Sequence, residues 1–168
     1  SESKFSAPHF YLTTKINVDS LIELRKNLIN NLDTKISFND IIIKAVAFSL
    51  SKHPNINVSW GQNSIIINKD INIGVAIAVE EGLVVPVIKK TDQHNILDIS
   101  QKIKDFVDKA NNKKLTIDEL TGNTFTVSNL GMFGIDEFTA IINPPDACIL
   151  AIGSIQETAV VKDGEIRI

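Results

Sequence analysis

Residues 71–79 constrain the fold more than any other stretch, because their side chains alternate regularly between large and small. The odd-numbered positions are all β-branched and the even-numbered positions are all small, in the order INIGVAIAV. A period of two predicts a β-strand with two distinct faces. A face without bulky side chains lets another backbone, a helix or a ligand approach closely. We therefore expect a strand over 71–79 whose small face leaves room for such an approach.

Apolar residues that recur at helical spacing predict three helices, over about 19–32, 37–52 and 96–110. Asp19 can cap the first helix. Either Ser37 or Asn39 opens the second, and Pro54 ends it. The centre of the second helix is apolar nearly all round, which predicts that it is buried on most sides.

Shorter strands are expected in alternating or continuous apolar runs, at about 10–18, 57–60, 64–68, 83–89, 124–128, 138–142 and 146–154. A final hairpin pairs 160–162 with 165–168 around the turn Asp163-Gly164. Thr116 and Glu119 fit a capping box for one short helical turn. We see no repeat and no low-complexity linker. The sequence thus predicts a single α+β domain over 1–168, with a mixed sheet.

Composition and charge exclude several classes of function. A chain of 168 residues can form one domain with a substantial core. Its net charge of -3 offers no basic excess to neutralise phosphates, so we expect no nucleic-acid partner. No run approaches 18 uninterrupted apolar residues, and we therefore expect no membrane-spanning segment.

Metal and disulfide chemistry are also poorly supported. The three histidines, His9, His53 and His94, are scattered and have no metal-binding spacing. Cys148 is the only cysteine, which excludes an intrachain disulfide and a thiolate-rich metal site. Because it lies in an apolar run, we interpret it as a buried structural thiol. No metal site is expected.

Three hydroxyl side chains share one face of the strand at 124–128. They are Thr124, Thr126 and Ser128, and the last of them leads into a loop bounded by glycines. The face is either the solvent-exposed half of a strand or a surface that presents a hydroxyl to a developing oxyanion in a channel. A nucleophile elbow is excluded because Thr126 stands where its first glycine should be, and no nucleotide-binding glycine motif occurs.

Residues 122–134, GNTFTVSNLGMFG, closely resemble the signature of dihydrolipoamide acyltransferases, the acyltransferase components of 2-oxo acid dehydrogenase complexes. The resemblance extends to AIINPP at 140–145, PHFYLT at 8–13, residues 39–47, GLVVPV at 82–87 and VKDGE at 161–165. It therefore covers nearly the whole chain in the family's order. The NLGMFG segment is most similar to the acetyl-transferring members from pyruvate dehydrogenase complexes.

This resemblance implies a fold like that of chloramphenicol acetyltransferase, with helices packed on a mixed central sheet. It implies transfer of an acyl group, expected to be acetyl, between a dihydrolipoyl thiol and coenzyme A. Coenzyme A would be a substrate, and the lipoyl group would be carried by another domain. The expected partners are further copies in a homotrimer that builds a larger core, the lipoyl domain and other components of the complex. The location would be the bacterial cytoplasm or the mitochondrial matrix.

The resemblance also implies roles for individual residues. Ser128 takes the position of the hydrogen-bond donor to the oxyanion. Arg25 takes the position that contacts the coenzyme A phosphates, and its alternative interpretation is an exposed helix cation. His9 is expected to be structural. Glu80 and Glu81 replace the more usual Thr-Pro before a glycine turn, and Glu80 would help to position other groups of the site.

The catalytic base is the main departure from the family's pattern. The family carries a histidine in an HxxxDG motif after the hairpin at Asp163-Gly164, and no such motif occurs up to Ile168. We therefore expect the base to lie beyond Ile168, the domain to be incomplete at its C-terminus, and this polypeptide alone to be inactive. Nothing in the chain resembles a lipoyl domain or a subunit-binding domain.

Two other functions stay open. Without a base, the chain would be a non-catalytic scaffold or assembly core, and the small face at 72–78 would suit an interface. A coenzyme A-dependent acetyltransferase acting on a small alcohol shares the fold, although the signature around Ser128 is that of the lipoamide enzymes. The sequence does not distinguish acetyl, succinyl and branched-chain transferases.

Overall fold

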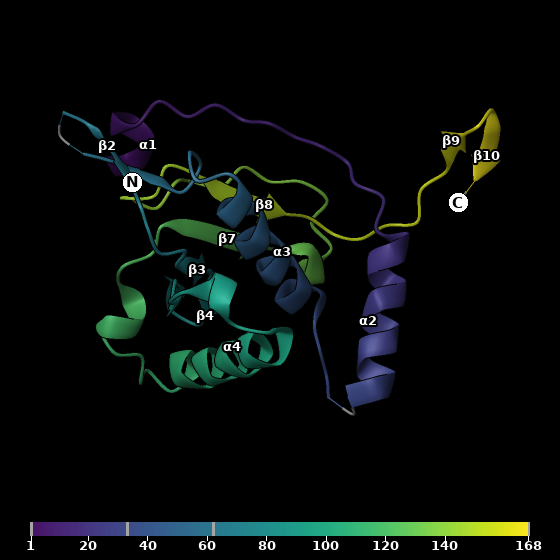
Figure 1. Cartoon of the computed structure of the whole chain (residues 1–168), viewed down its shortest axis with the longest axis horizontal. Coiled ribbons are helices and arrows are strands. Elements are labelled where there is room, and N and C mark those ends of the chain that lie inside the picture. The colour runs from purple at the N-terminus through teal and green to yellow at the C-terminus, as the bar shows by residue number, and fades with distance from the viewer. Residues whose placement is uncertain (1, 33, 62, 168) are drawn as a thin grey trace.

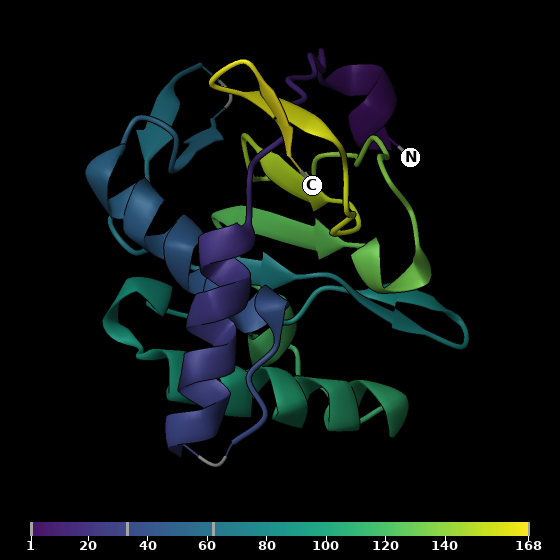
Figure 2. The same cartoon turned by 90° about the vertical axis from the view of Figure 1, so that its right-hand side faces the viewer.

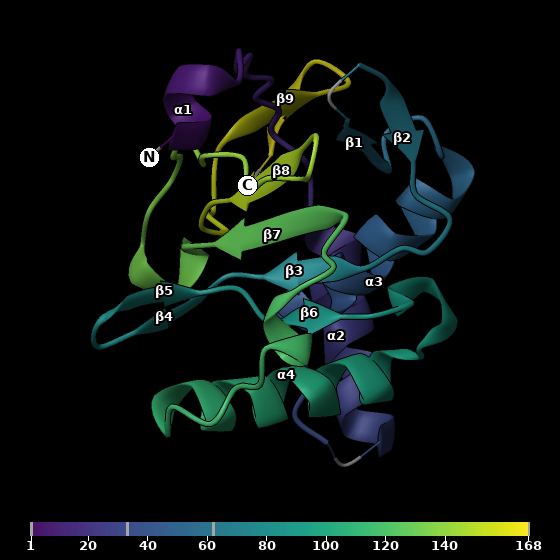
Figure 3. The ribbon, with the colours of Figure 1, turned by 90° about the vertical axis from the view of Figure 1, so that its left-hand side faces the viewer.

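A mixed sheet of four strands forms the centre of the molecule. The strands are β3 (Ile73–Val75), β6 (Val87–Ile88), β7 (Phe125–Asn129) and β8 (Ile149–Ile152), in the order β6-β3-β7-β8 (Figure 3). Strands β3, β7 and β8 are parallel, whereas β6 is antiparallel to β3. The predicted mixed sheet of an α+β fold is confirmed.

The structure is a computed structural model that describes residues 2–32, 34–61 and 63–167. Ile168, the last residue of the predicted C-terminal strand, lies outside the described residues. The same holds for Ser1, Asp33 and Gln62 of the predicted 1–168 domain.

Helices α3 (Phe38–Lys52) and α4 (Ile96–Asn111) pack on one face of the sheet and enclose the core (Figure 3). Each begins with a capping box, formed by Ser37 with Asp40 and by Asn95 with Asp98. The helices supply Ile43, Ala47, Ile99 and Phe106 to the core, and the sheet supplies Ile73, Val75, Phe125 and Val127. Both helices were predicted to within about one residue at each end.

One side of α3 is open, although its sequence predicts burial on most sides. Ile41, Ile43 and Leu50 are buried, but the ring of Phe48 is 60% exposed. A helix that packs on the core with one face needs only one apolar stripe. The remaining apolar residues of α3 therefore exceed what this core requires.

The N-terminal part consists of α1 (Glu2–Ser6), an extended segment over 7–18, and α2 (Asp19–Leu32). The segment crosses the molecule along the top of Figure 1 and leads down into α2. The predicted helix is confirmed, but the predicted strand at 10–18 is wrong. A strand requires a backbone partner, and among the described residues none pairs with this segment.

The predicted strand at 71–79 is divided at Ala76 into β3 and β4 (Ile77–Val79). Strand β4 pairs with β5 (Gly82–Val84) in a hairpin that projects from the body (Figures 2 and 3). Pro86 separates β5 from β6, so the two halves of 71–79 have different partners. The predicted close approach is confirmed at Gly74, where an added Cβ would lie 2.8 Å from Val85 Cγ1.

Two small antiparallel hairpins complete the strands. They are β1 (Val58–Trp60) with β2 (Ile65–Ile67), and β9 (Val160–Lys162) with β10 (Glu165–Arg167). Short 3-10 helices occur at η1 (Thr91–Gln93), η2 (Asp118–Leu120) and η3 (Gly131–Phe133). The predicted strand at 138–142 is wrong, because this stretch has no regular structure. Within the ranges that the structure describes, no helix is long and apolar enough to span a membrane.

Candidate functional site

The two faces of β7 separate the core from the candidate site. Phe125 and Val127 point toward the helices and are buried in the core. Because side chains alternate along a strand, Thr126 and Ser128 point to the opposite side of the sheet. Thr124 and Thr126 are also buried, at 7% and 1% exposure, so this face is not the solvent-exposed half of a strand.

A cavity of about 650 Å³ lies over this hydroxyl-bearing face. Its floor is formed by Ala76, Thr126, Ser128 and Ile149, and the β5 region adds Leu83 and Val85. The irregular stretch 138–144 forms one wall, and Ser3 of α1 closes part of the rim. Most of the lining side chains are apolar, so the cavity suits a flexible, largely apolar chain that carries a few polar groups.

The hydroxyls of Thr126 and Ser128 differ in what they can donate. Thr126 Oγ1 donates to Asp146 Oδ2 at 2.5 Å, so its hydrogen points away from the cavity. The Asp146 carboxylate also accepts from Asn123 Nδ2 at 2.8 Å. Burial raises the pKa of Asp146 to about 6, although both hydrogen bonds act in the opposite direction. Within the described parts of the chain, the Ser128 side chain has no hydrogen-bond partner, and its O–H is free to serve a ligand.

The loop after Ser128 is held against the neighbouring strand. Asn129 Oδ1 accepts from the Gly131 N–H at 2.9 Å, and Asn129 Nδ2 donates to Asn39 Oδ1 at 3.3 Å. Gly153, at the end of β8, packs so closely on the returning chain that a Cβ would lie 1.9 Å from the Asp136 carbonyl oxygen. These contacts fix the end of β7, and with it the position of Ser128.

The other predicted site residues lie outside the cavity lining. Arg25, on α2, donates from Nε to the Ile36 carbonyl at 2.8 Å, and its guanidinium carbon lies 4.7 Å from the centroid of the Phe38 ring. Glu80 is exposed in the turn between β4 and β5. Its neighbour Glu81 pairs with Lys113 at 2.5 Å, also at the surface.

None of the three histidines lines the cavity. His9 contacts backbone groups with both ring nitrogens. His94 Nε2 lies 3.1 Å from the Lys89 carbonyl oxygen, and His53 is exposed at the end of α3. No described group of three or more histidine, cysteine, aspartate or glutamate side chains could hold a metal ion.

Sequence reasoning missed Asp146 and the cavity wall. A charged residue at the start of the apolar run 146–154 was the available signal for Asp146, because a buried carboxylate requires hydrogen-bond donors. The wall at 138–144 contains the stretch 138–142, for which the sequence predicts a strand, so sequence reasoning did not place this stretch beside Ser128.

Comparison with known proteins gives consistent matches along the chain. The family described as 2-oxoacid dehydrogenases acyltransferase (catalytic domain) matches residues 1–168. The dihydrolipoyllysine-residue acetyltransferase component of the pyruvate dehydrogenase complex from Rickettsia felis is 45% identical over 99% of this chain. The chain spans only 42% of that relative's length.

Solved structures give the same result. A probable dihydrolipoamide acetyltransferase from Listeria monocytogenes superposes with a TM-score of 0.92 at 34% identity, over 98% of this chain and 72% of its own. The Azotobacter vinelandii dihydrolipoamide acetyltransferase superposes with a TM-score of 0.92 at 29% identity, over 98% of this chain and 70% of its own. That structure was studied for the roles of a serine, a histidine and an asparagine in catalysis. The cubic core of a pyruvate dehydrogenase multienzyme complex gives the same values. A chloramphenicol acetyltransferase shares the fold, with a TM-score of 0.50 at 14% identity over 84% of this chain and 69% of its own.

Proposed function

Because the chain belongs to the 2-oxoacid dehydrogenase acyltransferase (catalytic domain) family, we propose that it contributes the site of acyl transfer between a dihydrolipoyl thiol and coenzyme A. The acyl group is proposed to be acetyl. The observation that carries this proposal is the free hydroxyl of Ser128, which faces a largely apolar cavity of about 650 Å³. A lipoyl arm and the pantetheine arm of coenzyme A are flexible chains of the kind such a cavity accommodates.

Ser128 would act on the oxyanion that forms during transfer. The incoming thiol loses its proton to a base, and its sulfur attacks the carbonyl carbon of the thioester. The carbonyl oxygen becomes an oxyanion, to which the Ser128 O–H donates a hydrogen bond. Collapse of the tetrahedral intermediate expels the second thiolate, which recovers a proton from the protonated base. Both thiols must be held close to the carbonyl carbon of the thioester, and the cavity that Ser128 lines would hold them there.

The base is proposed to come from outside the described residues. His9, His53 and His94 do not line the cavity, and both ring nitrogens of His9 already contact backbone groups. A histidine in the HxxxDG motif that the family carries would meet this need. We accordingly expect the 168-residue polypeptide alone to transfer no acyl group at a measurable rate.

Arg25 and Glu80 are proposed to act at the margins of the site. The Nε–H of Arg25 is bound to the Ile36 carbonyl, which orients the guanidinium and leaves its two terminal nitrogens for the coenzyme A phosphates. Glu80 lies in the turn of the β4–β5 hairpin, whose second strand carries Leu83 into the cavity lining, and it would position that hairpin when substrate binds.

The complete assembly is proposed to be a homotrimer that builds a larger core, in the bacterial cytoplasm or the mitochondrial matrix. The lipoyl group would arrive on a separate domain, and other components of the complex would bind around the core. Exposed apolar side chains on the 7–18 segment and on the β9–β10 hairpin support an assembly role. They also favour the second candidate function, a scaffold without turnover. Acyl-transfer assays distinguish the two functions.

The test is acetyl transfer from acetyl-coenzyme A to free dihydrolipoamide, in the longest polypeptide that contains this sequence. Replacing the oxyanion donor, Ser128→Ala, should lower kcat by about 10²–10³ and change KM little. The matched control is Ser154→Ala, which removes a hydroxyl that bonds Asp136 outside the cavity lining. Equal loss in both variants would remove Ser128 from the mechanism. Normal binding without any transfer would favour the scaffold.

A further inference from the structure

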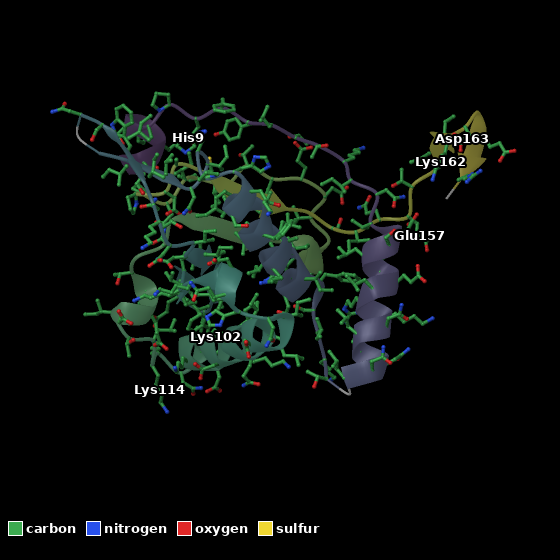
Figure 4. All side chains as sticks on the ribbon, in the orientation of Figure 1. His9, Lys102, Lys114, Glu157, Lys162 and Asp163 are labelled. Carbon is green, nitrogen blue, oxygen red and sulfur yellow. The ribbon has the colours of Figure 1, made fainter. Side chains whose placement is uncertain are left out.

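The N-terminal segment is bound to the cavity wall at Ile142. Ser3 Oγ donates to the Ile142 carbonyl at 2.7 Å, and the Ile142 N–H donates to His9 Nε2 at 3.1 Å. Ser3 and Ile142 both line the cavity that contains Ser128. Figure 4 labels His9 at the end of α1, where the segment begins to cross the molecule. Both peptide groups of the wall residue thus depend on side chains more than 130 positions away in the sequence.

The partners of the His9 ring permit only one protonation state. Its Nδ1 lies 2.6 Å from the Ala7 carbonyl oxygen, which can only accept a hydrogen bond. Its Nε2 faces the backbone N–H of Ile142, which can only donate. Both contacts are satisfied by the neutral ring with its proton on Nδ1, and by no other form. The assignment follows from the partners and requires no observed hydrogen.

Adding a second proton removes the bond to the wall. The imidazolium carries a hydrogen on both nitrogens, so Nε2–H would then face the Ile142 N–H. The wall contains no titratable side chain over 138–145. On the segment itself, the Tyr11 ring lies 6.4 Å from the His9 ring, and Lys4 donates to the Tyr11 hydroxyl. Glu137, just before the wall, accepts from Thr13. In the described part of the chain, no carboxylate hydrogen-bonds to His9.

We propose that His9 is a positioning residue for the substrate cavity: its neutral ring holds Ile142 in the wall opposite Ser128, and protonation of the ring releases that wall. The stretch 138–144 belongs to no helix or strand, so no helical or strand hydrogen-bond ladder holds the wall. The link to substrate binding rests on the proposed function. The ring's protonation state and the bond to Ile142 do not.

The first experiment measures these two features directly by NMR. The ¹⁵N shifts of the His9 ring should show the proton on Nδ1 above the titration of the ring. Protection of the Ile142 amide from hydrogen exchange, corrected for intrinsic rates, should fall about three- to tenfold as pH decreases through that titration. A proton on Nε2, or protection of Ile142 that does not change through the titration, would overturn the proposal.

Variants separate positioning from general stability. His9→Gln supplies a side-chain oxygen near the place of Nε2 that accepts at every pH, so Ile142 should stay protected and lose its pH dependence. His9→Leu should leave Ile142 unprotected at every pH. His53→Gln changes an exposed histidine outside the cavity and should behave as the unaltered chain. If His9→Leu protects Ile142 as well as the unaltered chain does, His9 does not position the wall.

Acyl-transfer kinetics in the longest polypeptide that contains this sequence then test the consequence for substrate. His9→Leu should raise KM for dihydrolipoamide about three- to tenfold with a smaller effect on kcat, and His9→Gln should restore it. An unchanged KM in His9→Leu would overturn the link to the cavity. Absence of transfer in every variant would instead contradict the proposed function, while the NMR result for His9 would still stand or fall independently.

Discussion

Asp146 makes the stability of the fold depend on pH in the direction opposite to that of most carboxylates. Burial raises the pKa of its carboxyl from 3.8 to about 6 in the folded chain. The folded state therefore binds the proton more tightly than the unfolded state does. The stability that Asp146 contributes in this way is complete below about pH 3.8 and is lost as pH rises through about 6. The difference corresponds to about 3 kcal/mol.

Asp146→Asn should remove this dependence, because an amide does not titrate. Relative to the unaltered chain, the free energy of unfolding of the variant should increase by up to about 3 kcal/mol as pH rises from 4 to 8. Urea unfolding at several pH values measures the difference, and Glu157→Gln is the control at an exposed carboxylate. A constant difference between the two proteins across this range would show that Asp146 is ionised at the same pH in both states.

Single residues were predictable where their roles depend on local periodicity. The alternation of Thr126 and Ser128 with Phe125 and Val127 placed the Ser128 hydroxyl on the face opposite the core, and the structure has this arrangement. The bonds from Asp146 to Thr126 and from Ile142 to His9 join residues 20 and 133 positions apart. No periodic pattern encodes such contacts.

The close packing of the end of β8 on the 131–136 loop depends on the absence of a side chain at Gly153. Its ideal Cβ would lie 1.9 Å from the Asp136 carbonyl oxygen, which belongs to backbone and cannot rotate away. Gly153→Ala should therefore push the 131–136 loop from the end of β8 and destabilise the chain by several kcal/mol. Thermal unfolding measures this effect. Ser154→Ala, at the next position, should cost far less, and equal losses would contradict the steric explanation.

Helix α4 is joined to η2 through the ammonium of Lys109, which lies 2.7 Å from both Asp105 and Glu119. Its hydrogen bonds to Asp105 and Glu119 raise the pKa of Lys109 to about 12. Hydrogen bonds from Lys109 and from the Thr116 backbone lower the pKa of Glu119 to about 2. The predicted capping box of Thr116 and Glu119 is confirmed by the Glu119 N–H, which donates to Thr116 Oγ1.

Glu119→Gln should lower the melting temperature at pH 7, and the loss should diminish as pH falls from about 4.5 to about 2. A carboxyl whose folded pKa is lowered stabilises the fold above its unfolded pKa and stops doing so as it becomes protonated. Melting curves between pH 2 and pH 7 provide the test. Asp118→Asn, whose pair with Lys89 is exposed, should have little effect. A loss independent of pH would mean that packing, not charge, connects the two elements.

Elements with a strong internal period were predictable, and elements that depend on a distant partner were not. The helices α2, α3 and α4 follow from their apolar spacing. The sequence also predicts strands at 10–18 and 138–142, but among the residues that the structure describes no backbone pairs with either, so neither forms a strand. The division of 71–79 at Ala76 likewise follows from Pro86, which interrupts the strand beside it.

At the scale of the whole molecule, apolar side chains that the core does not use gather on peripheral segments. Phe10, Leu12 and Ile16 on the N-terminal segment are 83%, 89% and 73% exposed. In Figure 1 the β9–β10 hairpin extends away from the body, and its Val161 and Ile166 are also largely exposed. Large exposed apolar side chains gathered on one segment are typical of protein interfaces.

The proposed homotrimer predicts what removing this surface does. Phe10→Ser combined with Leu12→Ser should weaken self-association at least tenfold, because burial of each side chain at an interface contributes about 1.5–3 kcal/mol. The stability of the separated chain should change by less than about 0.5 kcal/mol, since both side chains are exposed in it. Sedimentation velocity over a range of concentrations measures association, and Lys15→Ser, in the same segment, is the control. If the double variant associates as strongly as the control does, the N-terminal segment is not part of the interface, and the β9–β10 hairpin becomes the surface to change next.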